Sequence, residues 1–236
     1  MARTNLRPTA IIPLGDCAAY IEFSEKLDLE VNAVVQRLAL AVHGRAAPWI
    51  RDVVPALGGL ALHFDPDHPG AFGDALHAAA NLIADCLKEG LPEADDVLRT
   101  VEVPVCYEAQ YAPDIEEVAK KAGLSVEEVA RRHAAGEYRV LMIGFAPGHA
   151  YMGGLDAKLA VPRRATPRAR VPAGSVAIAN EQTVVYPYAI SGGWSVIGRT
   201  PLKVFDAARQ EPSLFAPGDR VRFRAISGEE FLKLAQ

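Results

Sequence analysis

The stretch VPAGSVAIANEQTVVYP, residues 171–187, decides the fold. It contains two short runs rich in β-branched and other apolar residues, at 175–179 and 183–186, in a region dense in Gly and Pro. Such runs bounded by turn-forming residues predict strands. Runs of the same kind lie on both sides of it, at 140–143, 195–197 and 220–225. Many short strands with Gly- and Pro-rich turns predict a β-barrel or a β-sandwich.

The first part of the chain follows another pattern, in which strands and helices alternate. Strands are predicted at 10–13, 17–23, 50–54 and 60–64, and apolar residues recur at helical spacing over 31–42 and 72–87. The order ββαββα predicts a small sheet with both helices on one side. We therefore expect an N-terminal two-layer α/β domain over residues 1–94.

Residues 95–236 are expected to form the barrel domain, which gives an α+β fold class overall. A strand is predicted at 99–107, a two-helix insertion near 113–135 and a closing helix at 227–234. Asp114 with Glu117, and Ser125 with Glu128, have the spacing of N-terminal helix caps.

Composition excludes several classes of function. The formal charge of −4 argues against a general role in binding nucleic acid or membrane surfaces, which requires a basic excess. No signal peptide and no apolar run of membrane-spanning length is visible. Three widely spaced cysteines, Cys17, Cys86 and Cys106, are typical of reduced thiols, and we expect a cytoplasmic protein.

An arginine-rich segment is the most unusual chemistry in this acidic chain. Prolines at 162, 167 and 172 stiffen the predicted loop that carries it, and rigid guanidinium groups suit a carboxylate or a phosphate. A solvated basic loop, or a patch facing an acidic partner, explains the same pattern. The arginines of the segment are Arg163, Arg164, Arg168 and Arg170.

Four other patterns favour structural explanations. Residues 193–200 match a phosphate-binding P-loop, but the residues that follow are extended rather than helical. The segment 63–68 offers two histidines and two aspartates to a metal, although its composition indicates a turn, so no metal site is predicted. Cys106 is interpreted as a buried thiol, and a loop histidine such as His149 is more often incidental than catalytic.

The segments GFAPGHAYMGGL (144–155), PRRATPRARVPAGSVAIAN (162–180) and GGWSVIGRTP (192–201) carry a resemblance to the KipI/allophanate hydrolase subunit 1 family. This family includes the B subunits of bacterial ATP-hydrolysing 5-oxoprolinase. Further matches include the Gly15-Asp16 turn, residues 64–66, Pro113-Asp114 and residues 217–223, so the resemblance spans nearly the whole chain. The chain departs from the family pattern at His149, where Phe is usual, and at Ser191, where Pro is usual.

The resemblance implies an N-terminal α/β domain, a cyclophilin-like barrel, and a cytoplasmic heteromer with a C subunit and an A subunit. It implies ATP, with Mg²⁺, as co-substrate of the complex, and the opening of 5-oxoproline to glutamate. For such a reaction we expect His149, Gln182 and Tyr186 as catalytic contacts, and an anion- or substrate-binding set comprising Arg163, Arg164, Arg168, Arg170, Gly192, Gly193 and Arg199.

Three other functions are compatible with the same residues. One is a subunit that acts on a urea-derived substrate, in an allophanate hydrolase or urea amidolyase. Another is a non-enzymatic inhibitor of a histidine kinase, like KipI itself. The last is a prolyl isomerase, which rests on fold analogy alone.

Overall fold

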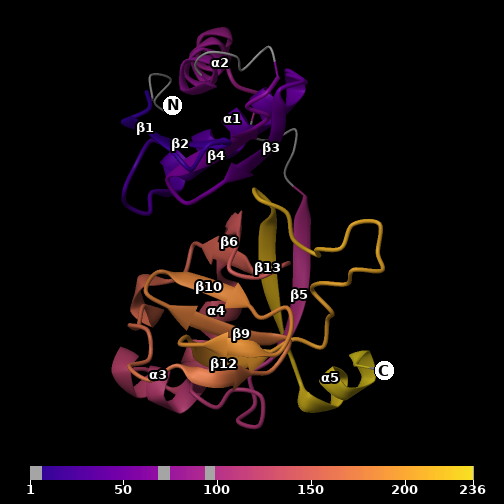
Figure 1. The fold of residues 1–236 in the computed structure, drawn as a ribbon. Coiled ribbons are helices and arrows are strands. Elements are labelled where there is room, and N and C mark those ends of the chain that lie inside the picture. Colours follow the sequence, from indigo (N-terminus) through magenta and orange to yellow (C-terminus); the bar gives the residue numbers. More distant parts are fainter. Residues whose placement is uncertain (1–6, 69–74, 94–98, 236) are drawn as a thin grey trace. The chain divides into compact units, whose positions relative to one another are not determined.

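The computed structural model describes residues 7–68, 75–93 and 99–235, and the chain divides into two compact units, Met1–Leu98 and Arg99–Gln236. Figure 1 shows both units and labels elements in each of them. The expected boundary between residues 94 and 95 lies outside the described residues. No helix within the described ranges has the length and apolar content needed to cross a membrane.

The first unit is an antiparallel sheet with strand order β1-β2-β4-β3. Ile21, Leu60 and Leu62 are fully buried in its core together with residues of both helices, so both helices cover one face of the sheet. The predicted ββαββα order is confirmed, while Phe72 of the second expected helix lies outside the described residues. The elements are β1 Ala10–Pro13, β2 Ala18–Glu22, α1 Leu29–Gly44, β3 Ile50–Pro55, β4 Gly59–Phe64 and α2 Ala75–Glu89.

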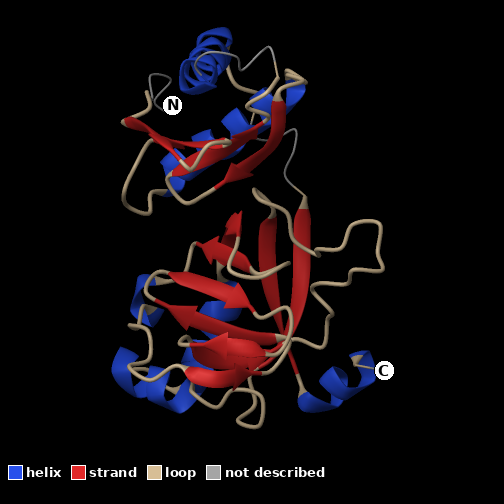
Figure 2. Cartoon of the chain, viewed as in Figure 1, coloured by secondary structure: helices blue, strands red, loops and turns tan. Residues whose placement is uncertain are grey.

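The second unit is a closed barrel with strand order β10-β7-β6-β13-β5-β12-β9, which confirms the predicted barrel. Strands β5 and β13 pair in parallel and lie side by side in Figure 1. A separate two-stranded ribbon pairs β8 with β11. The elements are β5 Thr100–Cys106, α3 Ile115–Ala122, α4 Val126–Ala135, β6 Glu137–Ile143, β7 Ala150–Gly153, a 3-10 turn Ala157–Leu159, β8 Arg168–Val171, β9 Ser175–Ala179, β10 Gln182–Val185, β11 Ile190–Gly192, β12 Ser195–Arg199, β13 Arg220–Ile226 and α5 Gly228–Leu234. Figure 2 distinguishes these helices from the strands by colour.

Two local expectations were wrong. The arginine segment is not all loop, because Arg168–Val171 forms β8. The side chain of Asp114 does not cap α3, since it accepts hydrogen bonds from elsewhere in the chain. The Ser125 cap is confirmed, because its side chain accepts from the backbone N–H of Glu128.

Alternation along the strands gives the barrel two different faces. Ala150 and Met152 of β7, with Val185 of β10, belong to the interior core. Their neighbours Val184 and Tyr186 belong to a second cluster with Val171 of β8 and Trp194, against which Tyr151 packs. This second cluster lies on the outer face of the barrel, beneath the β8–β11 ribbon.

The interior contains one fully buried histidine, His133, whose polar atoms are all satisfied. Its Nδ1 lies 2.7 Å from the hydroxyl of Tyr107, and its Nε2 lies 3.0 Å from Oγ1 of Thr183. Thr183 donates its single hydroxyl hydrogen to the carbonyl of Ala177, so it accepts from Nε2–H. His133 is therefore a neutral imidazole, and burial lowers its pKa to about 3.

This buried histidine makes the barrel sensitive to acid. The unfolded chain binds a proton on His133 below a pKa of roughly 6.5, whereas the folded chain does not until about 3. Stability is therefore present above pH 6.5 and falls as the pH drops towards 3, by about 1.4 kcal/mol per pH unit. The chain has two tryptophans, and in a Trp49→Phe background Trp194 reports urea unfolding of the barrel at pH 7, 6 and 5.

A matched His133→Gln chain serves as the control. It lacks the titrating group, so its stability should fall less steeply below pH 6.5, with the slope reduced by about 1.4 kcal/mol per pH unit. Equal slopes in the two chains would contradict the assignment of His133 as a neutral, uncharged core residue.

Candidate functional site

His149 is placed by a tight turn that leads into β7. The backbone N–H of Gly144 donates to the carbonyl of His149, and the N–H of His149 donates to the carbonyl of Ala146. Gly148 has φ of +75°, a conformation that glycine adopts without strain. Phe145 has φ of +69°, which is strained for an aromatic residue and is common at functional sites.

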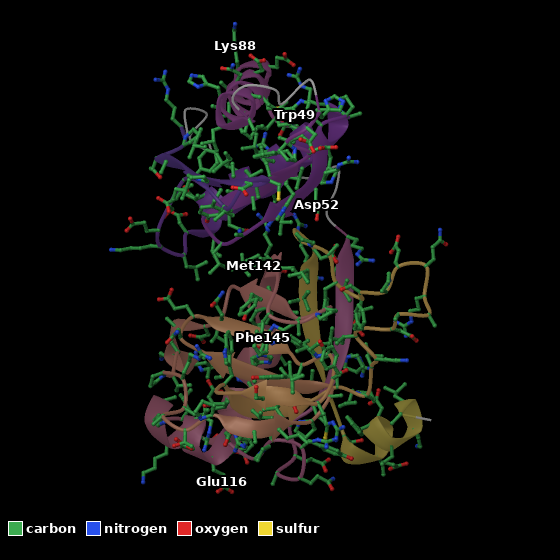
Figure 3. The ribbon with its side chains drawn as sticks, in the orientation of Figure 1. Trp49, Asp52, Lys88, Glu116, Met142 and Phe145 are labelled. Carbon is green, nitrogen blue, oxygen red and sulfur yellow. The ribbon has the colours of Figure 1, made fainter. Side chains whose placement is uncertain are left out.

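An aromatic cluster surrounds this histidine on the outer face of the barrel. The ring of His149 lies 4.9 Å from that of Tyr151 and 5.4 Å from those of Phe145 and Tyr186, centroid to centroid. Tyr151 also meets Trp194 edge to face at 5.9 Å. Phe145, labelled in Figure 3, is 67% exposed, so the cluster is open to solvent at that residue.

His149 is held neutral with one nitrogen unsatisfied. The residue is 3% exposed, and its Nδ1 has no hydrogen-bond partner among the described residues. Burial lowers its pKa to about 4, so the imidazole is uncharged at neutral pH. An unpaired buried polar atom costs free energy, so this nitrogen is an unusual feature of the cluster.

The two phenols of the cluster are held in their neutral form. Burial raises the pKa of Tyr186 and of Tyr151, and the positive charge of Arg163 partly opposes both shifts. The backbone N–H of Trp194 also donates to the Tyr186 oxygen. Arg163 is thus the cation whose field reaches both phenols.

Two glycines bring the backbone close to this cluster. A Cβ on Gly192 would overlap the phenol oxygen of Tyr186, so only glycine fits there. The carbonyl of Gly193 accepts a 2.7 Å hydrogen bond from the backbone N–H of Arg164. The expected glycine pair therefore adjoins both the aromatic cluster and the arginine segment.

The predicted arginines fall into two groups. Arg164 and Arg168 both bind the carboxylate of Asp114, and Nε of Arg199 donates to the carbonyl of Ala173. Arg163 and Arg170 are exposed, and neither forms an ion pair with a residue of the described ranges. The side chains of Arg163 and Arg170 are therefore available to an external anion.

A bulge in β8 separates the environments of Arg168 and Arg170. Ile190 pairs with Val171, while Gly192 pairs with Arg168, so three steps on β8 face two steps on β11. Such an extra residue turns the strand locally. Arg168 is therefore directed to Asp114 while Arg170 is exposed, although residues two apart on a regular strand share a face.

Gln182 is not brought together with His149 and Tyr186. It begins β10 opposite Gly153, whereas Val185 at the other end of the strand pairs with Ala150. Four residues of strand separate Gln182 from Tyr186, about 13 Å at the usual rise. The Nε2 atom of Gln182 is also buried without a partner among the described residues.

The segments 193–200 and 63–68, and Cys106, belong to strands and turns of the fold. β12 covers most of residues 193–200 and no helix follows it directly, so there is no P-loop. Asp65 accepts from Arg51 and from the N–H of Asp67, as a turn requires. No cluster of three or more His, Cys, Asp or Glu that could hold a metal occurs in the described ranges. Cys106 is fully buried, and burial raises its pKa.

Sequence reasoning missed Asp114 and Phe145 as residues of this region. Asp114 was interpreted only as a helix cap, and nothing in its local pattern indicates arginine partners 50 and 54 residues away. The one available signal was the excess of positive charge at 163–170. Burying any of these arginines requires a carboxylate close by that compensates its charge.

Comparison with known proteins now identifies the family. Residues 9–215 match the family model described as "Carboxyltransferase domain, subdomain C and D". The chain belongs to this carboxyltransferase-domain family. It is also 38% identical over 223 residues to the B subunit of 5-oxoprolinase from Bacillus subtilis (strain 168), covering 92% of this chain and 93% of that protein.

Two solved structures agree with the fold. The crystal structure of TTHA0988 superposes with a TM-score of 0.75 at 37% identity, covering 90% of this chain and 40% of that one. The urea amidolyase of K. lactis superposes with a TM-score of 0.74 at 18% identity, covering 98% of this chain and 16% of that one. At that identity the second likeness shows the fold alone.

The tight contact at Gly192 leads to a prediction. Gly192→Ala should destabilise the barrel by about 1–3 kcal/mol, because the added methyl group must displace Tyr186, which is only 1% exposed. Gly193→Ala is the matched control, since a Cβ there lies 3.5 Å from Pro167, an ordinary contact. Urea unfolding measures both, and equal destabilisation of the two variants would show that Gly192 is not a site of close approach.

Proposed function

We propose that this chain is the B subunit of an ATP-dependent 5-oxoprolinase complex that opens 5-oxo-L-proline to L-glutamate. The observation that carries the proposal is the 38% identity to a 5-oxoprolinase B subunit over 92% of this chain, to which the structure adds exposed arginines and a neutral, buried His149. A polar, uncharged group in an aromatic cluster suits a small planar lactam, and the arginines suit its carboxylate.

The chemistry explains why such a reaction needs ATP. A lactam carbonyl is a poor electrophile because the amide is resonance-stabilised. Transfer of the γ-phosphoryl group to the carbonyl oxygen releases ADP and activates the carbon. One water then adds to this carbon and the ring C–N bond breaks, the nitrogen leaving as the amine. A second water cleaves the resulting acyl phosphate to give glutamate and inorganic phosphate.

The residues of this chain have distinct roles in that reaction. Arg163 and Arg170 bind negative charge, on the substrate carboxylate or on the transferred phosphoryl group. In the tautomer with the proton on Nε2, Nδ1 of His149 accepts a hydrogen bond from the ring N–H or from the attacking water. The phenol of Tyr186 and the backbone at Gly192 line the same face, and Gln182 at the far end is a more distant polar contact.

The complex, rather than this chain alone, is proposed to hold ATP and Mg²⁺. The described residues include neither a P-loop nor an acidic metal cluster, so no step is assigned here to a metal bound by this chain. The partners proposed are a C subunit of related barrel fold and an A subunit, in the cytoplasm. The exposed Phe145 is available to such a partner.

The direct test is to reconstitute this chain with the chains encoded beside it and to measure glutamate formed from 5-oxoproline with and without ATP. Arg163→Met should raise KM for 5-oxoproline or for ATP on the order of ten-fold, because one charge-assisted contact is lost. Arg131→Met, on the exposed face of α4 and paired only with Glu128 in the described contacts, is the control.

The outcomes separate the alternatives. Absence of ATP-dependent glutamate formation from the wild-type complex would exclude the proposal. Turnover of a ureido substrate by the same complex would instead favour the urea amidolyase alternative. Retained activity with unchanged KM in Arg163→Met would remove the anion-binding role while leaving the proposed place in the complex intact.

His149 yields a prediction about pH. Because burial holds its pKa at about 4, activity that depends on the neutral imidazole should show no inflection near pH 6.5, and should be lost as the pH falls through about 4. His149→Phe introduces the residue that is usual in the family and removes Nδ1, so it tests the imidazole directly: kcat/KM should fall by about 10²-fold or more if the imidazole transfers protons. Thermal unfolding checks that the variant folds, and a loss below about three-fold would exclude such a role.

A further inference from the structure

Asp114 is a buried carboxylate at which three separate segments of the barrel unit meet. It is 3% exposed and immediately precedes α3. Its Oδ1 accepts from Nη1 of Arg164 at 2.8 Å and from Nη2 of Arg168 at 2.6 Å. Its Oδ2 accepts from Nη1 of Arg168 and from the backbone N–H of Val196, both at 2.7 Å. We call Asp114, Arg164 and Arg168 the Asp114 cluster.

The backbone of Asp114 adds a further connection. Its N–H donates to the carbonyl of Val196 at 3.0 Å, so Asp114 and Val196 are joined by two hydrogen bonds. The start of α3 is therefore fixed to β12 independently of the arginines. This makes the carboxylate a stationary point to which the arginine segment is attached.

The Asp114 cluster is connected through the backbone both to the glycines of the candidate site and to Arg163. The backbone N–H of Arg164 donates to Gly193, and Arg168 pairs with Gly192 in the β8–β11 ribbon. Arg163, whose charge acts on Tyr151 and Tyr186, is the residue next to Arg164. The position of Arg163 and the position of the Gly192–Gly193 turn are thus both set by where Asp114 holds its two arginines.

We infer that Asp114 is a positioning residue for the anion-binding surface formed by Arg163, Arg170 and the Gly192–Gly193 turn, and that it acts by binding Arg164 and Arg168. The inference rests on the proposed function. It also divides the four arginines of the segment by role: two hold the loop and two meet the ligand. Substitution of Asp114 should therefore weaken ligand binding although Asp114 does not contact the ligand.

The test compares Asp114→Asn with Glu117→Gln in the reconstituted complex. The amide of Asn cannot accept all the guanidinium donors, so the arginine segment loses its register. KM for 5-oxoproline or ATP should rise about ten-fold or more while kcat changes less. The reason is that the exposed arginines are no longer held in position for their charge-assisted contact with the ligand. Glu117 is 48% exposed and accepts from Arg164 at 3.2 Å, but it is not part of the Asp114 cluster. In Glu117→Gln, KM and kcat should remain within about two-fold of the wild-type values.

Hydrogen exchange provides a readout that does not depend on activity. In Asp114→Asn the amide of Arg164, normally bonded to Gly193, should exchange faster than in wild type. Faster exchange together with raised KM supports the inference. Faster exchange with unchanged KM, or unchanged exchange, overturns it, because the cluster would then stabilise the fold without positioning the site.

A paired variant distinguishes positioning from loss of stability. Asp114→Leu with Arg168→Met removes the carboxylate together with one of its two arginines, while Arg164 keeps Glu117 as a partner. Removing both members of a buried ion pair commonly restores the stability lost by breaking it. The thermal midpoint should recover relative to Asp114→Asn while KM stays raised. Recovery of both the thermal midpoint and the wild-type KM would overturn the inference. An inactive wild-type complex would contradict the proposed function, and this inference with it, whereas an active wild type with an unaffected Asp114→Asn contradicts the inference alone.

Discussion

The carboxylate of Asp114 is the constraint on which the outer face of the barrel depends. A buried carboxylate is tolerated only when hydrogen bonds and opposite charge replace its hydration. Here two guanidinium groups and the N–H of Val196 provide that replacement. Satisfying this one group brings together α3, β8 and β12, which are far apart along the chain, and it determines which arginines remain exposed.

Two buried histidines of the barrel differ in whether their ring nitrogens have hydrogen-bond partners. His133 and His149 are both neutral and both nearly inaccessible, and burial lowers the pKa of each. In the interior, both ring nitrogens of His133 have partners, whereas on the outer face Nδ1 of His149 has none among the described residues. The two histidines are equally buried but unequally hydrogen-bonded, and this difference is why the proposed function assigns ligand contact to His149 and not to His133.

The sequence predicts most of the fold because strands and helices leave periodic patterns. The runs at 175–179 and 220–225 were recognisable, while β8 was not, since an arginine-rich strand with a bulge has no period-two pattern. The arginines were visible as a cluster, but their directions were not. Those depend on the register of β8 against β11 and on Asp114, a partner that only the tertiary fold brings near.

The same electrostatics suggest why the proposed reaction requires activation by ATP. The acidic groups next to the arginine segment, Asp114 and Glu117, are both engaged by arginines, which leaves His149 as the titratable base within the aromatic cluster. A base with a pKa of about 4 takes a proton from water with little driving force. Attack on an unactivated lactam would need a stronger base. After phosphorylation the carbonyl carbon is electrophilic enough for a weak base, or none, to suffice. Burial of His149 in an apolar cluster is therefore consistent with chemistry in which ATP, rather than a strong base, supplies the driving force.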